Sequence, residues 1–141
     1  MNRMIFVNLP VTDLARSIAF YEAIGASADP HFRDETTQMM RISEEICVML
    51  LNHERFQGFT PRNIPDAHET AQVLLCLSAG SRDEVDETTE KAGKSGGIAD
   101  PNPKQDHGFM YGRSFADPDG HIWELAWMDM AAAMNASAEN A

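Results

Sequence analysis

The sequence is short of positive charge, and this shortage excludes several classes of partner. Its 141 residues contain 11 Lys and Arg against 22 Asp and Glu, which gives a formal net charge of −11. Nucleic acids and anionic membranes are bound through basic surfaces, so neither is expected as a partner. The acidic balance is compatible either with a cationic ligand or simply with a solubilising surface.

Cysteine is also scarce, since Cys47 and Cys76 are the only two. Both lie in apolar runs, which favours buried free thiols over a disulfide and fits a reducing, cytoplasmic location. Long apolar segments are missing too, so we expect neither a membrane span nor a signal peptide. Hydrophobic residues nevertheless make up 43% of the chain, which is enough for the core of a single domain over 1–141.

The most informative segment lies near the C-terminus and predicts two strands joined by a tight turn. Pro118 presets φ at the first central position of the turn, and Gly120 suits a position with positive φ. Alternation along the strand predicted over 121–128 places Glu124 on one face together with Ile122. A carboxylate in an otherwise apolar strand needs a partner, a cation or water. Glu124 is therefore the first candidate functional residue.

The elements predicted along the chain repeat one order, strand–helix–strand–strand–strand. They are a strand over 4–11, a helix capped by Thr12 or Asp13 and running to 24, strands over 37–42, 46–51 and 71–79, a helix capped by Ser81 and running to 94, a segment over 100–107, and strands over 109–115 and 121–128. We expect a first module over about 1–55, a polar linker or lid over about 56–70, a second module over about 71–130, and a short helical or frayed tail over 131–141.

Two motifs resemble the vicinal oxygen chelate superfamily, which includes glyoxalase I, extradiol dioxygenases, fosfomycin-resistance enzymes and bleomycin-resistance proteins. Residues 117–124, Asp-Pro-Asp-Gly-His-x-x-Glu, are similar to the last hairpin of that family, and residues 7–21 are similar to its first strand and helix. The closest resemblance is to the lactoylglutathione lyase-like branch. The resemblance implies an α+β fold, in which two βαβββ modules form a cupped mixed sheet around a cavity with helices outside. It also implies a homodimer, because family members commonly complete their cavities by pairing or swapping modules.

The resemblance further implies a divalent metal with one ligand on each of four strands, yet this sequence lacks most of those ligands. The last ligand falls on Glu124, and the others fall on Phe6, on Leu74, and on either Val48 or Met49. Phenylalanine and leucine have no donor atom, and a thioether is too soft for metals that prefer oxygen. We therefore expect no metal at these positions and no cofactor. A relocated metal site would need other donors near the mouth of the cavity, namely His53, His68, Asp106 and His107.

Alternation also predicts which side chains line the cavity. Besides Glu124, the expected ligand-binding residues are Phe6, Asn8, Leu74, Cys76, Met110, Gly112 and Ser114. This lining is apolar with a few polar groups, which suits a small organic molecule. The alternative is a packed core in which Glu124 reaches Asn8, Ser114 or water. The opposite face is expected to pack beneath the helices with structural polar contacts, and it carries Tyr111, Arg113, Phe115, Trp123 and Trp127.

The sequence leaves several functions open, including whether the protein is an enzyme. The protein either sequesters a small molecule or performs metal-independent chemistry. Sequestration is what bleomycin-resistance proteins do in the family that the sequence resembles. In the second case Glu124 is the candidate general base, and Asn8 or Ser114 would hold a substrate oxygen. The alternative is a metal-dependent lyase, isomerase or dioxygenase of the same superfamily with relocated ligands.

Overall fold

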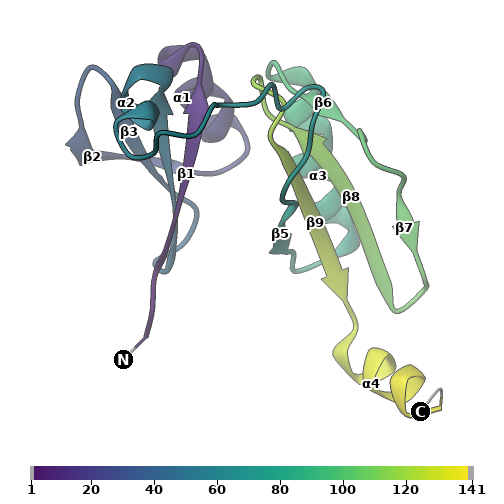
Figure 1. Cartoon of the computed structure of the whole chain (residues 1–141). Coiled ribbons are helices and arrows are strands. Elements are labelled where there is room, and N and C mark those ends of the chain that lie inside the picture. Colours follow the sequence, from purple (N-terminus) through teal and green to yellow (C-terminus); the bar gives the residue numbers. More distant parts are fainter. Residues whose placement is uncertain (1, 140–141) are drawn as a thin grey trace.

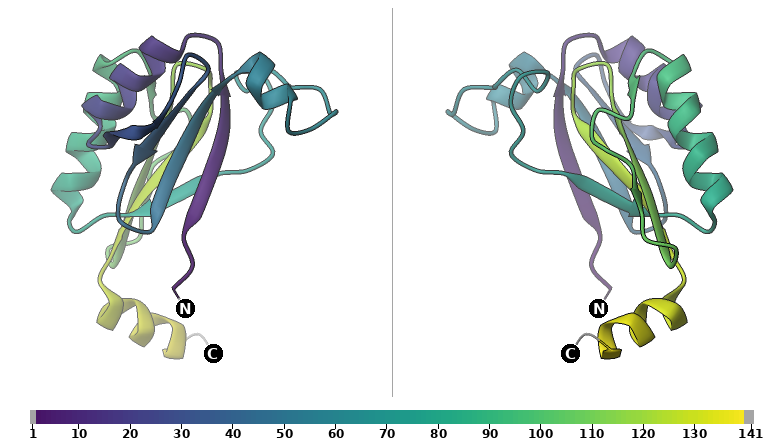
Figure 2. Two further views of the ribbon diagram at one scale, coloured as in Figure 1. Left: turned by 90° about the vertical axis from the view of Figure 1, so that its left-hand side faces the viewer. Right: turned by 90° about the vertical axis from the view of Figure 1, so that its right-hand side faces the viewer.

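The computed structural model describes residues 2–139 as an α+β protein with two mixed β-sheets. In chain order the elements are β1 (Ile5–Val11), α1 (Leu14–Ala23), β2 (Ser27–Arg33), β3 (Thr37–Arg41), β4 (Ile46–Asn52), α2 (His53–Gln57), β5 (Leu75–Ser78), α3 (Arg82–Lys94), β6 (Ile98–Ala99), β7 (Gln105–Asp106), β8 (Met110–Ala116), β9 (Ile122–Met128) and α4 (Met130–Glu139). The two sheets lie side by side (Figure 1). Helices α1 and α3 lie on one side of them, and the linker with α2 lies on the other (Figure 2).

Both sheets have the same topology, which confirms the repeated order predicted from the sequence. The first has the strand order β1-β4-β3-β2 and the second β5-β9-β8-β6, with β7 also paired to β8. In each sheet the strand that precedes the helix pairs in parallel with the last strand of the repeat, β1 with β4 and β5 with β9. The remaining pairs are antiparallel. As a result, β1 and β5 are edge strands of their sheets.

Local sequence signals explain where the two long helices begin. The Asp13 side chain accepts a hydrogen bond of 3.1 Å from the backbone N–H of Arg16, which makes Asp13 rather than Thr12 the cap of α1. Ser81 caps α3 in the same way by accepting from the backbone N–H of Glu84. These caps satisfy backbone donors that the first turn of a helix leaves free.

A single hydrophobic core lies between the helices and both sheets. The ring of Phe20, from α1, lies 6.0 Å from the ring of Phe115 on β8, and the ring of Tyr21 lies 6.2 Å from that of Trp123 on β9. These contacts join the helix of the first module to the strands of the second. All four side chains are buried, which confirms that the face opposite Glu124 packs beneath the helices.

Several elements differ from the sequence expectation, among them β6, a strand of two residues that was not predicted. Strand β2 was not predicted, because Pro30 and a register shift between Ala28 and Arg33 break its alternation. Strand β5 is shorter than the expected 71–79, since its pairing with β9 begins only at Leu75. A short helix that was not predicted, α2, spans the boundary between the expected first module and the expected linker.

The two cysteines have different environments. Both are free, and Cys47 is buried as expected, but Cys76 is exposed, so the expectation of burial was wrong there. Cys76 pairs with Glu124 rather than with a core residue, so it lies on the face of β5 away from α3. Because β5 is also an edge strand, no strand in the described part of the chain covers Cys76 on its other side.

Helix α4 stands away from both sheets (Figure 1). The side chains of Met130 and Met134 are 63% and 68% exposed on it. The sequence expectation of a helical tail is met through 139, and residues 140 and 141 lie outside the described residues. No helix in the described part of the chain is long and apolar enough to cross a membrane.

Candidate functional site

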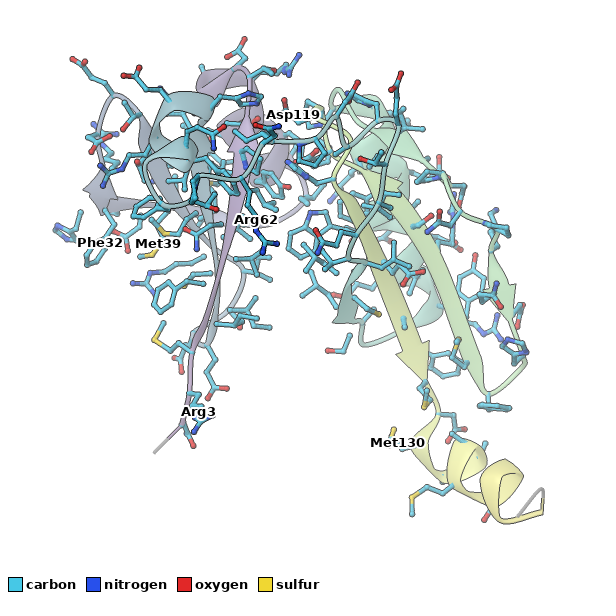
Figure 3. The ribbon with its side chains drawn as sticks, viewed as in Figure 1. Arg3, Phe32, Met39, Arg62, Asp119 and Met130 are labelled. Atoms are coloured by element: carbon cyan, nitrogen blue, oxygen red, sulfur yellow. The ribbon has the colours of Figure 1, made fainter. Side chains whose placement is uncertain are left out.

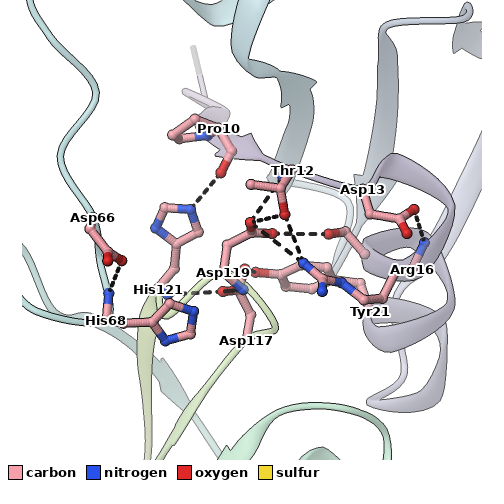
Figure 4. Close-up of polar contacts among 11 residues, drawn as sticks. Pro10, Thr12, Asp13, Arg16, Tyr21, Asp66, His68, Asp117, Asp119 and His121 are labelled. Atoms are coloured by element: carbon pink, nitrogen blue, oxygen red, sulfur yellow. Dashed lines mark hydrogen bonds and ion pairs between the residues drawn. The ribbon is translucent and has the colours of Figure 1, made fainter.

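The turn between β8 and β9 is hydrogen-bonded to the start of α1 in the other module (Figure 4). The Asp119 carboxylate accepts from the backbone N–H of Thr12 at 2.9 Å and from the Thr12 hydroxyl at 2.8 Å. Ser17 donates to it at 3.4 Å, and Arg16 lies 3.7 Å away. Asp119 lies at the end of the molecule where the modules meet, far from Met130 (Figure 3). It therefore connects the two modules.

Asp117 is a second, buried connection. Its carboxylate accepts from the backbone N–H groups of Asp119 and His121, at 3.0 and 2.9 Å, and from the Tyr21 hydroxyl at 2.7 Å. The Tyr21 hydroxyl in turn accepts from Nε1 of Trp123 at 3.0 Å. Burial raises the pKa of Asp117 despite these hydrogen bonds, and burial followed by the Asp117 charge raises the pKa of Tyr21 well above its usual value.

Gly120 brings the linker against this turn. Its φ of +94° confirms the positive φ expected from the sequence. A Cβ at this position would lie 2.6 Å from the backbone nitrogen of His68 and 2.7 Å from the carbonyl carbon of Ala67. Only glycine lets the backbone of the linker approach so closely.

His121, the next residue, is held at both its backbone and its side chain. Its backbone N–H donates to Asp117, and Nε2 lies 2.8 Å from the carbonyl oxygen of Pro10 on β1 (Figure 4). The imidazole ring therefore bridges the start of β9 to the first sheet.

Two abutting cavities lie where this turn, β1 and the linker meet. One has a volume of about 430 Å³ and a polar lining that includes Arg16, His53, Asp66, His68 and Asp119. The other has a volume of about 500 Å³ and a largely apolar lining that includes Leu9, Phe56, Val73, Leu75 and Ile122. Both are lined by Pro10, Pro65, Ala67 and His121. Their volumes are those of sites for small organic ligands.

The structure separates the predicted ligand-binding residues into two groups. Asn8 lines the apolar cavity, and its amide donates a hydrogen bond of 3.4 Å to the carbonyl of Phe6. On the second sheet, Cys76, Glu124 and Ser114 lie in one row across β5, β9 and β8. Desolvation of its sulfur, followed by the Glu124 charge, raises the pKa of the Cys76 thiol. Asn8 and Glu124 are not hydrogen-bonded to each other among the described side chains.

Glu124 is half-buried, and no hydrogen bond from the side chains of residues 2–135 or from the backbone of 2–139 reaches its carboxylate. Ser114 does not donate a hydrogen bond to Glu124. Its hydroxyl instead accepts from the backbone N–H of Asn102 at 3.0 Å and donates to the Asn102 carbonyl at 3.4 Å. Glu124 and Ile122 share one face of β9, and two residues along a strand are about 7 Å apart. Glu124 therefore lies one step along the strand from the apolar cavity.

The other predicted lining residues surround this row. Met110 and Gly112 are half-buried and follow the face of Ser114 along β8. Phe6 and Leu74 are 49% and 51% exposed. None of these four lines either cavity.

The family positions for a metal do not fit one in this chain. Met49 pairs with Asn8 on the face away from α1, whereas Val48 is fully buried, so Met49 is the residue that occupies the fourth position. With Phe6 and Leu74 at two others, Glu124 is the only hard donor of the set. Among the described residues, no group of three or more His, Cys, Asp or Glu is placed to hold a metal ion.

The alternative metal-ligand candidates named from the sequence differ in their surroundings. His53 and His68 line the polar cavity, as expected for residues near a cavity mouth. Asp106 instead pairs with Arg82 at 2.8 Å, and this hydrogen bond lowers the pKa of Asp106 to about 2. His107 stacks on Phe109, with ring centroids 6.3 Å apart.

The polar residues expected on the helix-covered face have structural contacts, as predicted. The buried Arg113 guanidinium donates to Asp86, Glu90 and Asp100 at 2.6–3.0 Å. Its hydrogen bonds lower the pKa of Asp100. The Tyr111 hydroxyl donates to Asp86 at 2.6 Å, which lowers the pKa of that carboxyl.

Apart from His68, named as a possible metal donor, sequence reasoning did not single out His121 or the linker residues as parts of a site. His121 belongs to the turn motif, but its contact with Pro10 joins positions 111 residues apart. No local pattern indicates such a contact. The close approach of the linker to Gly120 is equally non-local.

The fold and the cavities between the sheets define a class of α+β proteins built from paired βαβββ modules. Residues 3–125 match the Glyoxalase/Bleomycin resistance protein/Dioxygenase superfamily, and the chain belongs to this family. No curated protein matches the sequence.

Solved structures share this fold. The hypothetical protein SA1046 from S. aureus is 27% identical, with 90% of this chain and 94% of that chain covered and a TM-score of 0.74. The fosfomycin resistance protein FosX from Mesorhizobium loti is 18% identical, with 95% and 96% covered and a TM-score of 0.63. TnmS3, an antibiotic binding protein from Streptomyces, is 17% identical, with 92% and 98% covered and a TM-score of 0.61.

Proposed function

We propose that the protein binds a small organic molecule with an apolar body in the apolar cavity between its two sheets. The observation that carries this proposal is the cavity of about 500 Å³ lined by Leu9, Phe56, Val73 and Ile122. Apolar pockets of this size with few polar groups are the usual form of small-molecule sites. A ligand there would extend along β9 to Glu124, the centre of the site expected from the sequence.

Two roles are compatible with such a site. Sequestration is supported by the likeness in fold to TnmS3, which is described as an antibiotic binding protein. Metal-independent chemistry would use Glu124 as a general base, since its carboxylate has no partner among the side chains of residues 2–135. Within the superfamily we place the chain nearest to the lactoylglutathione lyase-like branch, on the strength of its two sequence motifs.

A binding titration with 2-methoxynaphthalene, an apolar probe smaller than the cavity, tests this proposal. Ala71 lines the apolar cavity, whereas Ala15 is exposed on α1 and lines neither cavity. We expect Ala71→Trp to weaken binding roughly tenfold or more by filling the site, and Ala15→Trp to leave it unchanged. Binding that is equal in all three proteins, or absent from the wild type, would contradict the proposal.

The alternative is a metal-dependent lyase, isomerase or dioxygenase with relocated ligands. The observation in its favour is that His53, His68 and His121 all line the polar cavity. Metal analysis of protein purified without chelators or added metal distinguishes the two. About one bound metal per chain, lost in His68→Ala, would support the alternative.

We also propose that the protein forms a homodimer in the cytoplasm. The edge strands β1 and β5 and their flanking residues expose apolar side chains. These are Ile5 and Phe6 on β1 and Val73 and Leu74 before β5. Exposed sheet edges of this kind are usually covered by another chain. The cytoplasmic location is supported by the two free cysteines. Sedimentation should show a dimer, and Ile5→Glu should weaken it. Phe32→Glu, which changes a similarly exposed residue on β2, should leave the dimer intact. A wild-type monomer at high concentration would refute the assembly.

A further inference from the structure

We infer that His121 determines which ligands the site accepts, by receiving a hydrogen bond through Nδ1 from a hydroxyl or N–H group attached to an apolar body. This inference rests on the proposed function and names the chemical class of its ligand. It follows from the hydrogen bonding of the ring, from its position between the two cavities, and from the charges around it.

The hydrogen bond to Pro10 assigns the tautomer of His121. A carbonyl oxygen can only accept, so Nε2 at 2.8 Å from it carries the proton. In the neutral ring Nδ1 is then an acceptor with a free lone pair. No hydrogen bond from the described groups, the side chains of residues 2–135 and the backbone of 2–139, reaches Nδ1. A ligand that reaches this atom can therefore donate a hydrogen bond to it.

The position of His121 makes it the polar centre of the site. It lines both cavities, so a ligand that occupies the apolar one meets the ring at the boundary with the polar one. The other polar side chains that line the apolar cavity are exposed, namely Asn8, Thr70 and Gln72, whereas His121 is half-buried. A hydrogen bond to a shielded group discriminates more strongly than one to a group in free contact with water.

The ring is also held in place before any ligand binds. The backbone of His121 is bonded to the buried Asp117, and its side chain is bonded to β1. Two anchors on different sheets leave little rotational freedom to lose on binding. Preorganisation of this kind increases both affinity and selectivity.

The charges next to the ring favour a neutral donor over an anion. Asp66 and Asp119 line the polar cavity, and the one arginine there, Arg16, donates to the Thr12 hydroxyl beside Asp119. A carboxylate ligand would meet these negative charges, and the whole chain carries a net charge of −11. Phenols, enols and aromatic amines combine an apolar body with a neutral donor and fit both cavities.

A pair of probes tests the inference, because 2-naphthol has a hydroxyl that can donate, whereas a methyl group replaces that hydrogen in 2-methoxynaphthalene. We expect the wild type to bind 2-naphthol roughly tenfold more tightly. His121→Gln keeps an N–H group near the position of Nε2 and lacks the acceptor at Nδ1. In this variant the preference should disappear, so that the two probes bind with equal affinity.

The possible outcomes separate this inference from the proposed function. Equal binding of both probes by the wild type overturns the inference and leaves the proposed cavity standing, whereas binding of neither probe overturns both. A preference that persists in His121→Gln also overturns the inference. Should the variant fail to fold, ¹⁵N NMR of the wild-type ring decides: Nδ1 must be unprotonated in the free protein, and its resonance must shift with 2-naphthol but not with the ether. Any other result refutes the inference.

Discussion

The Tyr21 hydroxyl donates a hydrogen bond of 2.7 Å to the Asp117 carboxylate, which lies 96 residues further along the chain. Tyr21 belongs to the helix of the first module, and Asp117 belongs to the last turn of the second. Because both groups are buried, this bond and the one from Trp123 hold the modules together at the end where the cavities lie.

Replacement of Tyr21 by Phe should destabilise the protein by about 1–3 kcal/mol, because it leaves two buried polar groups without a partner. These groups are an oxygen of Asp117 and Nε1 of Trp123. The matched control is Tyr111→Phe, whose hydroxyl bonds the half-exposed Asp86, where water can replace it. We expect a loss below about 1 kcal/mol for the control. Urea denaturation measures both, and a control loss as large as that of Tyr21→Phe would contradict this account.

The raised pKa of Tyr21 predicts a loss of stability at alkaline pH. Burial raises this pKa in the folded state, so the stabilising contribution is complete below the unfolded value, which is about 10. Above that pH the unfolded chain releases the proton while the folded chain keeps it, so the unfolded state becomes more favourable. The free-energy difference between wild type and Tyr21→Phe should therefore shrink as pH rises from about 9 to about 11. A difference that grows over this range would show that the sign is wrong.

Substitution of Glu124 by Gln should change stability by less than about 0.5 kcal/mol, as is usual for side chains without structural partners. The reason is that no hydrogen bond reaches this carboxylate within the described residues. If Glu124 is a functional base or contacts a cationic ligand, activity or binding should be lost while the melting temperature stays constant. Clear destabilisation with unchanged binding would defeat the functional assignment of Glu124.

Glyoxalase I activity with methylglyoxal and glutathione should be absent. The family positions for a metal carry Phe6, Leu74 and Met49, which cannot bind a divalent ion that prefers oxygen and nitrogen ligands. An assay with added nickel, zinc, manganese or iron checks this directly. Turnover above background that a chelator abolishes would show that the chain recruits other ligands.

The sequence predicts those parts of the fold that depend on local periodicity and capping. Alternation along β9 correctly places Trp123 in the core and Glu124 on the opposite face, and Ser81 is the cap of α3, as predicted. Strand β2 escapes prediction because Pro30 and a register shift remove the alternation that identifies a strand. Cys76 escapes because an apolar run does not reveal that its strand is an edge.

The site is less predictable than the fold, because its cavities form between distant segments. Pro10, Ala67 and His121 line both cavities, yet they come from a strand, the linker and the last turn. The positive φ of Gly120 is visible in the sequence, but the approach of the linker that also requires glycine is not. Only the three-dimensional structure brings these residues together.

Amide NMR of the protein with a bound probe shows directly whether the apolar cavity is the binding site. Titration of 2-naphthol into ¹⁵N-labelled protein should shift the amides of Phe56, 70–73 and 120–122, together with Glu124, one step further along β9. These residues surround the apolar cavity between the sheets or border it. Shifts that are confined to other surfaces, such as the exposed start of β1 or helix α4, would contradict the claim that this cavity is the binding site.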